Sequence, residues 1–145
     1  MTFDVDHTRL KQGIYKADIT YDLRVVVPYS GCLVSNSAMH SLEHILAWRL
    51  NSKINKIYFG PMGCQTGFYL LSDNPEEEVY QAIIEACEEA LADKTVPFAT
   101  MAECGNYYTL QWTQEVENIL VLLTDMAKKA LAEPGVYVYP IIGEE

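Results

Sequence analysis

Two histidines and a glutamate stand within five residues of this chain, in the sequence HSLEH at positions 40–44. The protein has only three histidines, and two of them lie in this one segment. Successive residues of an α-helix are rotated by about 100°, so positions 40, 43 and 44 project from one face. His40 and His44 could then bind one metal ion, with Glu43 beside it as a general base. A helix face that carries two ordinary histidines is the alternative interpretation.

A third ligand is required, because a catalytic divalent metal usually has three protein ligands and one open position for water or substrate. The candidates are His7, the cysteines and the carboxylates. Cys104 is followed by a glycine that permits a tight turn, and Cys64 lies in the glycine-rich segment 60–67. Cys87 falls on the apolar stripe of an expected helix and is more typical of a buried small hydrophobe. Spacing favours Cys104 only slightly, so Cys104 and Cys64 both remain candidates at this point.

The hydrophobic pattern places HSLEH on a helix. Ser37 stands where an N-cap belongs, and apolar residues recur at helical spacing to about residue 52 without Gly or Pro. A second helix is expected from Asn74, which is followed by a proline and three glutamates that suit the positive end of the helix dipole. A third helix is expected from near Thr113 to the Pro-Gly pair at residues 134–135.

Strand patterns occupy the intervals between these helices. Apolar residues alternate over residues 19–27, and β-prone runs cover residues 56–59, 68–71 and 107–112. The terminal run 136–141 is also β-prone, and it could add an edge strand or pack on a neighbour. We therefore expect an α+β fold with all 145 residues in one domain, a layered α/β sandwich in which about three helices cover a mostly antiparallel sheet.

Composition excludes several classes of partner. Half of the residues are hydrophobic and the formal net charge is −10, which opposes binding to nucleic acid and to anionic membranes. No apolar run approaches the roughly 20 residues of a membrane-spanning helix, and the first residues lack the pattern of a signal peptide, so we expect a cytoplasmic protein. The four cysteines are too widely spaced for a C-x-x-C site, which favours reduced thiols or metal thiolates, and Cys32 has no context that indicates chemistry.

Several motifs together resemble one enzyme family. They are HSLEH, the loop FGPMGCQTGFY at residues 59–69, ECG at residues 103–105 and FDVDH at residues 3–7. In this order and spacing they resemble S-ribosylhomocysteine lyase, the LuxS family, from about residue 3 to the third expected helix. The resemblance implies a homodimeric metalloenzyme that cleaves S-ribosylhomocysteine to homocysteine and 4,5-dihydroxy-2,3-pentanedione, the precursor of the quorum-sensing signal autoinducer-2. It also implies one divalent metal per chain, Fe(II), which zinc or cobalt can replace.

The resemblance further implies roles for individual residues. The implied metal ligands are His40, His44 and Cys104. The implied acid–base pair is Cys64 and Glu43, and the implied substrate contacts are His7, Arg24 and Thr2. Thr2 stands where many members have serine, Tyr58 stands where some have aspartate, and the tail beyond Pro134 has no counterpart that we can align. The departures fall outside the implied metal ligands.

The implied reaction explains these residue types. Moving a carbonyl along a ribose needs repeated proton abstraction, with stabilisation of the negative charge that develops on oxygen. The resemblance also implies a composite dimer site. One feature of the sequence agrees with it, since the short N-terminal segment 2–7 would be ordered only by packing on another surface, such as the neighbouring subunit's metal site. H-x-x-E-H is also a zinc-peptidase signature, which would take a carboxylate third ligand such as Glu85, Glu88 or Glu89 but leaves the Gly-Pro-Met-Gly-Cys loop unexplained. An inactive relative with a structural metal is the non-enzymatic alternative.

Overall fold

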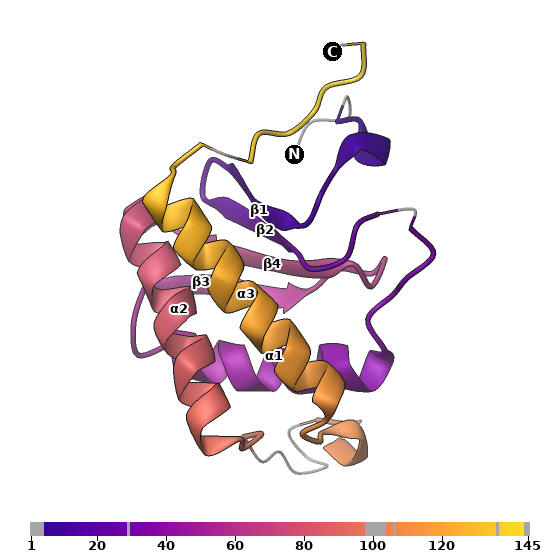
Figure 1. The fold of residues 1–145 in the computed structure, drawn as a ribbon. Helices are drawn as coiled ribbons and strands as arrows, with labels where there is room; N and C mark the ends of the chain where they lie inside the picture. Colours follow the sequence, from indigo (N-terminus) through magenta and orange to yellow (C-terminus); the bar gives the residue numbers. More distant parts are fainter. Residues whose placement is uncertain (1–4, 29, 98–103, 106, 136, 144–145) are drawn as a thin grey trace.

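An antiparallel sheet and three α-helices form two layers in the computed structural model (Figure 1). The structure describes residues 5–28, 30–97, 104–105, 107–135 and 137–143. The strands are β1 (Gly13–Ala17), β2 (Thr20–Arg24), β3 (Lys56–Pro61) and β4 (Gly67–Ser72), in the order β1-β2-β4-β3. The helices are α1 (Asn36–Leu50), α2 (Glu76–Asp93) and α3 (Gln114–Ala132), with the short 3-10 helices η1 (His7–Arg9) and η2 (Tyr107–Thr109). The predicted α+β class is confirmed.

The first two strands form a hairpin that the sequence pattern captured only in part. Strand β2 is shorter than the predicted 19–27, because the backbone N–H groups of Val25 and Val26 both turn to the carbonyl of Thr66. Strand β1 was not predicted. Its first three residues are all buried, so it lacks the alternation that identifies a half-exposed strand.

The three predicted helices are present, and side-chain caps set the starts of α1 and α3, whereas α2 begins after Pro75 without a side-chain cap. The N-cap of α1 is Ser35 rather than the predicted Ser37, because the Ser35 hydroxyl accepts the Ala38 N–H at 3.2 Å. Helix α3 begins as predicted, with the Thr113 hydroxyl accepting the Val116 N–H at 3.2 Å. Capping therefore explains where α1 and α3 begin.

The strand predicted at residues 107–112 is wrong. Residues 107–109 form η2, and the following residues contact α1 instead of a strand. The Ser37 hydroxyl donates to the Thr109 carbonyl at 2.7 Å, and the Gln111 N–H donates to the Ser41 hydroxyl at 3.0 Å. These contacts with α1 override a β-prone composition and bring Thr109 next to the HSLEH segment.

The helices cover one face of the sheet, and the C-terminal tail lies beside strand β1. Figure 1 shows α2 and α3 side by side across the sheet, with α1 crossing behind their lower parts. The tail runs from α3 past β1, where the Tyr15 ring lies 5.5 Å from that of Tyr137 and 5.1 Å from that of Tyr139, between centroids. Val5 and Ile141 then form an isolated antiparallel bridge. The tail thus packs on its own chain and joins the N-terminal segment.

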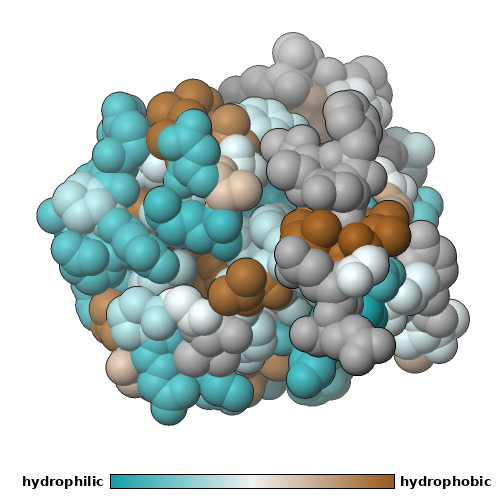
Figure 2. Space-filling model, turned by 90° about the horizontal axis from the view of Figure 1, so that it is seen from above, coloured by the Kyte–Doolittle hydropathy of each residue, from teal (hydrophilic) through white to brown (hydrophobic). Residues whose placement is uncertain are grey.

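Exposed hydrophobic side chains are scattered over the surface. Leu33, Trp48 and Val138 expose 60%, 64% and 73% of their area. Figure 2, seen from above, shows hydrophobic atoms in brown as separate patches among hydrophilic side chains in teal. Such scattering is normal for a folded domain. Within the described residues, no helix has the length and apolar character needed to cross a membrane.

Candidate metal centre and active site

Three metal-binding side chains converge beside α1. His40 and His44 lie one helical turn apart, with their ring centroids 4.8 Å from each other. Cys104 Sγ lies 3.0 Å from His40 Nε2, and one possible ligand atom from each of the three residues lies within 4.8 Å of the others. The structure therefore brings together the two histidines of the motif and the cysteine that spacing slightly favoured.

The donor set fits a divalent transition metal. In a tetrahedral site, metal–nitrogen distances of about 2.1 Å and metal–sulfur distances of about 2.3 Å put the ligand atoms about 3.5 Å apart. The possible ligand atoms of the three residues lie at comparable distances, 3.0 Å between Cys104 Sγ and His40 Nε2 and at most 4.8 Å for any pair. The Thr109 hydroxyl lies 2.8 Å from His40 Nδ1, which leaves Nε2 directed at Cys104. Burial, followed by the nearby His44, lowers the pKa of His40 and favours the neutral imidazole that binds metals. Two imidazoles and one thiolate would supply three of the four ligands that such a metal takes.

Glu43 lies beside this group but is not part of it. It precedes His44 on α1, is half-buried, and its charge acts on His40 in the direction that raises the pKa of that imidazole. A carboxylate in this position can exchange protons with a molecule that binds beside the three ligands.

A second cluster of predicted residues lines a cavity of about 400 Å³. Its described lining residues are His7, Arg24, Pro28, Gly31, Cys32, Leu33, Cys64 and Thr66. His7 begins η1, Arg24 ends β2, and Cys64 lies in the loop between β3 and β4. The cavity therefore combines three sequence-predicted residues with Cys32 and Thr66, which the sequence did not single out.

The loop between β3 and β4 has its shape for steric reasons. The N–H of Met62 donates to the Gly67 carbonyl at 2.9 Å, and the Met62 carbonyl accepts the N–H of Gln65 at 3.0 Å. Gln65 adopts a left-handed conformation with φ 61°. A Cβ at Gly67 would lie 2.1 Å from the Leu23 carbonyl oxygen, so this position must be glycine. The tight loop presents Cys64 to solvent above β2.

The Cys64 thiol has two polar neighbours. Its Sγ lies 3.0 Å from Thr66 Oγ1 and 3.8 Å from Arg24 Nη1, and Arg24 Nη1 donates to Thr66 Oγ1 at 2.9 Å. Burial acts to raise the pKa of Cys64, but the Thr66 hydroxyl and N–H and the Arg24 guanidinium outweigh it, and the pKa is lowered. The arrangement favours a thiolate, which is the nucleophilic and basic form.

Arg24 is positioned by the buried carboxylate of Asp22. Arg24 and Asp22 are only 4% and 2% exposed, and the Arg24 guanidinium lies 3.9 Å from the Asp22 carboxylate. The Tyr139 hydroxyl, from the C-terminal tail, donates to the same carboxylate. Arg24 Nε has no hydrogen-bond partner among the described residues. Arg24 also lines the cavity, so these buried groups fix a positive charge at its wall.

The predicted site residues therefore form two groups in one chain. His40, His44 and Cys104 converge at α1, whereas the described lining of the cavity that holds Cys64 includes none of these three. Thr2 lies outside the described residues. Thr109 was missed because it fell in the wrongly predicted strand. Asp22 and Tyr139 carry no sequence signal, because their contact joins residues 117 positions apart.

These features define a small α+β protein with a candidate divalent-metal centre and, separate from it, a cysteine thiol whose pKa is lowered. The sequence model of the S-Ribosylhomocysteinase (LuxS) family matches residues 1–132, and the chain belongs to this family.

Relatives agree with this assignment. S-ribosylhomocysteine lyase of Desulfotalea psychrophila is 34% identical to this chain over an alignment of 156 positions that covers 92% of this chain and 97% of that protein. The protein of the same name from Thermus thermophilus is 37% identical over 123 aligned positions, which cover 73% of this chain and 77% of that protein. The protein of the same name from Borreliella burgdorferi is 34% identical over 122 aligned positions, which cover 73% of this chain and 78% of that protein. The family resemblance inferred from the motifs is confirmed.

Proposed function

We propose that this protein is an S-ribosylhomocysteine lyase that releases homocysteine and 4,5-dihydroxy-2,3-pentanedione. The observation that carries the proposal is the convergence of His40, His44 and Cys104 in a chain of this family. The lowered pKa of the Cys64 thiol also supports it. The peptidase alternative has no support, because the third group beside the histidines is a thiol rather than a carboxylate.

His40, His44 and Cys104 would hold one divalent metal, which we take to be Fe(II), with zinc or cobalt as replacements. When bound, the metal supplies Lewis acidity that stabilises negative charge on a substrate oxygen. His40 is positioned for this role by Thr109, at 2.8 Å from its second ring nitrogen.

Cys64 and Glu43 would move the protons. As a thiolate, Cys64 can take a proton from a sugar carbon next to a carbonyl and return it to the neighbouring carbon, so that the carbonyl migrates from C1 through C2 to C3. Glu43 would assist removal of the C4 proton, after which the C5–sulfur bond breaks and homocysteine leaves with the electron pair. Arg24 and His7 would bind and orient the substrate, because both line the cavity that contains Cys64.

The direct test is turnover of the substrate by anaerobically purified protein. We expect thiol release from S-ribosylhomocysteine, measured with a thiol-reactive dye, in proportion to bound metal. Metal-loaded protein that releases no homocysteine would refute the proposal and favour an inactive relative. Metal analysis of the same sample also tests the choice of Fe(II).

We also propose a homodimer with composite active sites. The proposal is supported by the arrangement of the candidate residues in two groups, which a partner subunit could bring together by placing its thiol cavity over the metal-binding group. Because His7 and Cys64 of one chain line the same cavity, both residues of that chain would act in the same composite site.

Subunit exchange tests this arrangement. A chain with Cys64→Ala keeps the metal group, and a chain with His44→Ala keeps the thiol cavity, so their heterodimer would contain one intact site. Random exchange should restore about a quarter of wild-type activity, since half of the dimers are mixed and each has one of two sites. Mixing Cys64→Ala with His7→Ala is the control and should restore nothing. Sedimentation as a monomer, or equal results from both mixtures, would contradict the composite site.

A further inference from the structure

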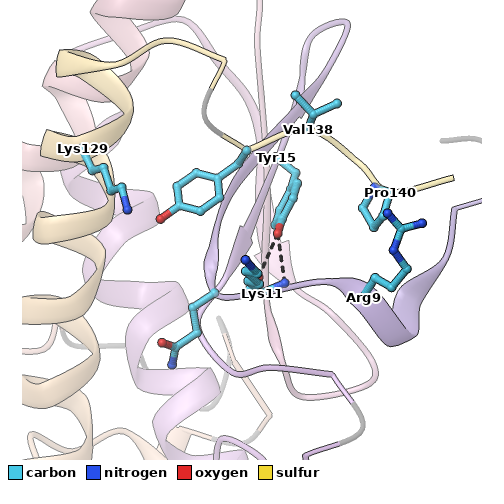
Figure 3. A pocket seen from close by; sticks show the side chains of 8 residues that line it. Arg9, Lys11, Tyr15, Lys129, Val138 and Pro140 are labelled. Atoms are coloured by element: carbon cyan, nitrogen blue, oxygen red, sulfur yellow. Dashed lines mark hydrogen bonds between the residues drawn. The ribbon is translucent and has the colours of Figure 1, made fainter. Parts of the chain in front are cut away.

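A second and larger cavity, of about 650 Å³, lies between η1, β1, α3 and the C-terminal tail (Figure 3). Its described lining residues are Arg9, Lys11, Gln12, Tyr15, Lys129, Tyr137, Val138 and Pro140. None of them lines the cavity that contains Cys64. Figure 3 shows Lys129 and Arg9 on opposite sides, with Lys11 below, Val138 above and Pro140 beside Arg9.

The charge of this lining is opposite to that of the protein. Three of its residues are basic and none of the described lining residues is acidic, although the whole chain has twenty acidic and ten basic side chains. Three tenths of the Lys and Arg residues are therefore gathered at one cavity. Such a cluster creates a local positive potential in a field that is otherwise negative.

The two lysines of the cavity differ from other lysines of the protein in their partners. Lys53, Lys94 and Lys128 form salt bridges with glutamates. Within the described part of the chain, neither Lys11 nor Lys129 has such a bridge, and Lys129 Nζ instead lies 5.7 Å from the centroid of the Tyr137 ring. Both ammonium groups can therefore bind an anion without losing a carboxylate partner.

The walls of the cavity are fixed by other contacts. The Tyr15 hydroxyl donates to the Lys11 carbonyl at 3.2 Å and accepts the Lys11 N–H at 3.0 Å (Figure 3). Gln12 donates to the Val25 carbonyl at 2.8 Å, and Arg9 donates to the Ile141 carbonyl at 3.3 Å. These bonds hold the lining in place before a ligand arrives, which lowers the entropic cost of binding.

The tail wall depends on a glycine in β1. A Cβ at Gly13 would lie 2.5 Å from the Tyr137 ring, so only glycine lets this ring pack against the strand. Residues 137, 138 and 140 lie beyond the segment 1–132 that matches the family. The cavity is thus completed by a part of the chain outside the family match.

We propose that this cavity is a binding site for an organic polyanion, a phosphate ester or a polycarboxylate of about nucleotide size. More than one negative charge is indicated because three cationic side chains surround the space, Arg9 from η1, Lys11 from the coil that follows it and Lys129 from α3. An organic body is indicated because the cavity is far larger than a single phosphate ion and falls in the range of roughly 300–1,000 Å³ that is typical of small-molecule sites. The tyrosine rings, Val138 and Pro140 supply an apolar surface for that body.

Calorimetric titration of the full-length protein tests the site. The probes are a nucleoside diphosphate and a tricarboxylate, which separate the two ligand sources, with the uncharged nucleoside as the negative control. Lys129→Gln and Lys11→Gln should each weaken the bound probe by about tenfold or more, the usual effect of removing a charged hydrogen-bond donor. Lys128→Gln is the matched control and should change the affinity little, because Lys128 directly precedes Lys129 on α3 and forms a salt bridge with Glu88.

A charge-reversal pair gives a second measurement. Val138 is 73% exposed on the rim, so Val138→Asp should fold normally and abolish binding by repulsion. Val121→Asp, at an exposed position of α3 that is outside the described lining, should not. The proposal is overturned by absence of saturable binding for both probes, by equal weakening in the Lys128 and Lys129 variants, or by binding that both pocket lysine variants leave unchanged, which would indicate an adventitious ion only.

Discussion

Replacing Thr66 by valine should make the Cys64 thiol a weaker acid and a slower nucleophile. The Thr66 hydroxyl lies 3.0 Å from the Cys64 sulfur and accepts the Arg24 guanidinium at 2.9 Å, so it stabilises the thiolate and holds a cation near it. Valine keeps the volume of the side chain and removes both contacts. The pKa of Cys64, which these groups lower, should therefore rise.

The size of the effect follows from the exposure of the sulfur. A hydrogen bond to a charged group contributes about 1.5–3 kcal/mol when both partners are buried. Cys64 is exposed, so water replaces part of that stabilisation, and about 1 kcal/mol should be lost by the thiolate. This corresponds to about a fivefold lower thiolate fraction at a pH below the pKa. Thr66 itself is buried, and loss of the acceptor for Arg24 should lower the free energy of unfolding by about 1–3 kcal/mol.

The assay is the rate of alkylation of Cys64 by iodoacetamide as a function of pH. Peptide mass spectrometry separates Cys64 from Cys32, an exposed thiol that lines the same cavity. Thr124→Val is the matched control, because Thr124 is also buried and its hydroxyl donates to the Leu120 carbonyl within α3. A folded Thr66→Val protein with an unchanged pH–rate profile for Cys64, or the same slowing in Thr124→Val, would refute the reasoning.

Three further predictions concern the metal group, the proposed base and the tail. Cys104→Ala should lose the metal by elemental analysis while Cys64→Ala keeps it, and the opposite result would reverse our assignment of the two thiols. Glu43→Gln should keep the metal and the fold but lose at least about a hundredfold in homocysteine release, so normal turnover would remove this residue from the mechanism. Tyr139→Phe should lower the free energy of unfolding more at about pH 7 than at about pH 4, as measured by denaturant titration. Burial already raises the pKa of Asp22 above 3.8, and the Tyr139 phenol stabilises its carboxylate, so the penalty grows as the pH rises through that range; a pH-independent loss would contradict this account.

Local patterns predicted the helical framework of the fold. The 3.6-residue repeat and the capping residues were sufficient to predict three helices, and that periodicity also predicted that His40 and His44 share a face of α1. The glycine and proline residues around Cys64 predicted an irregular loop, because their backbone preferences act over a few residues. These features need only information from neighbours in the sequence.

Long-range contacts decided the remaining features. The run at residues 107–112 is β-prone, yet its partners are Ser37 and Ser41 of α1, about seventy positions away, so it folds as η2 and adjoining coil. Spacing separated Cys104 and Cys64 only slightly, whereas the tertiary structure places Cys104 beside His40 and Cys64 beside Arg24.

The amino-acid sequence by itself determined the family, the helices and the types of chemistry available to this protein. Only the tertiary structure decided that the candidate residues form two separate groups, that the tail reaches Asp22 through Tyr139, and that basic residues surround a second cavity. The physical reason is the range of the interactions. Helix formation and turn geometry depend on residues a few positions apart, whereas a cavity or a buried hydrogen bond depends on surfaces that meet only when distant elements pack.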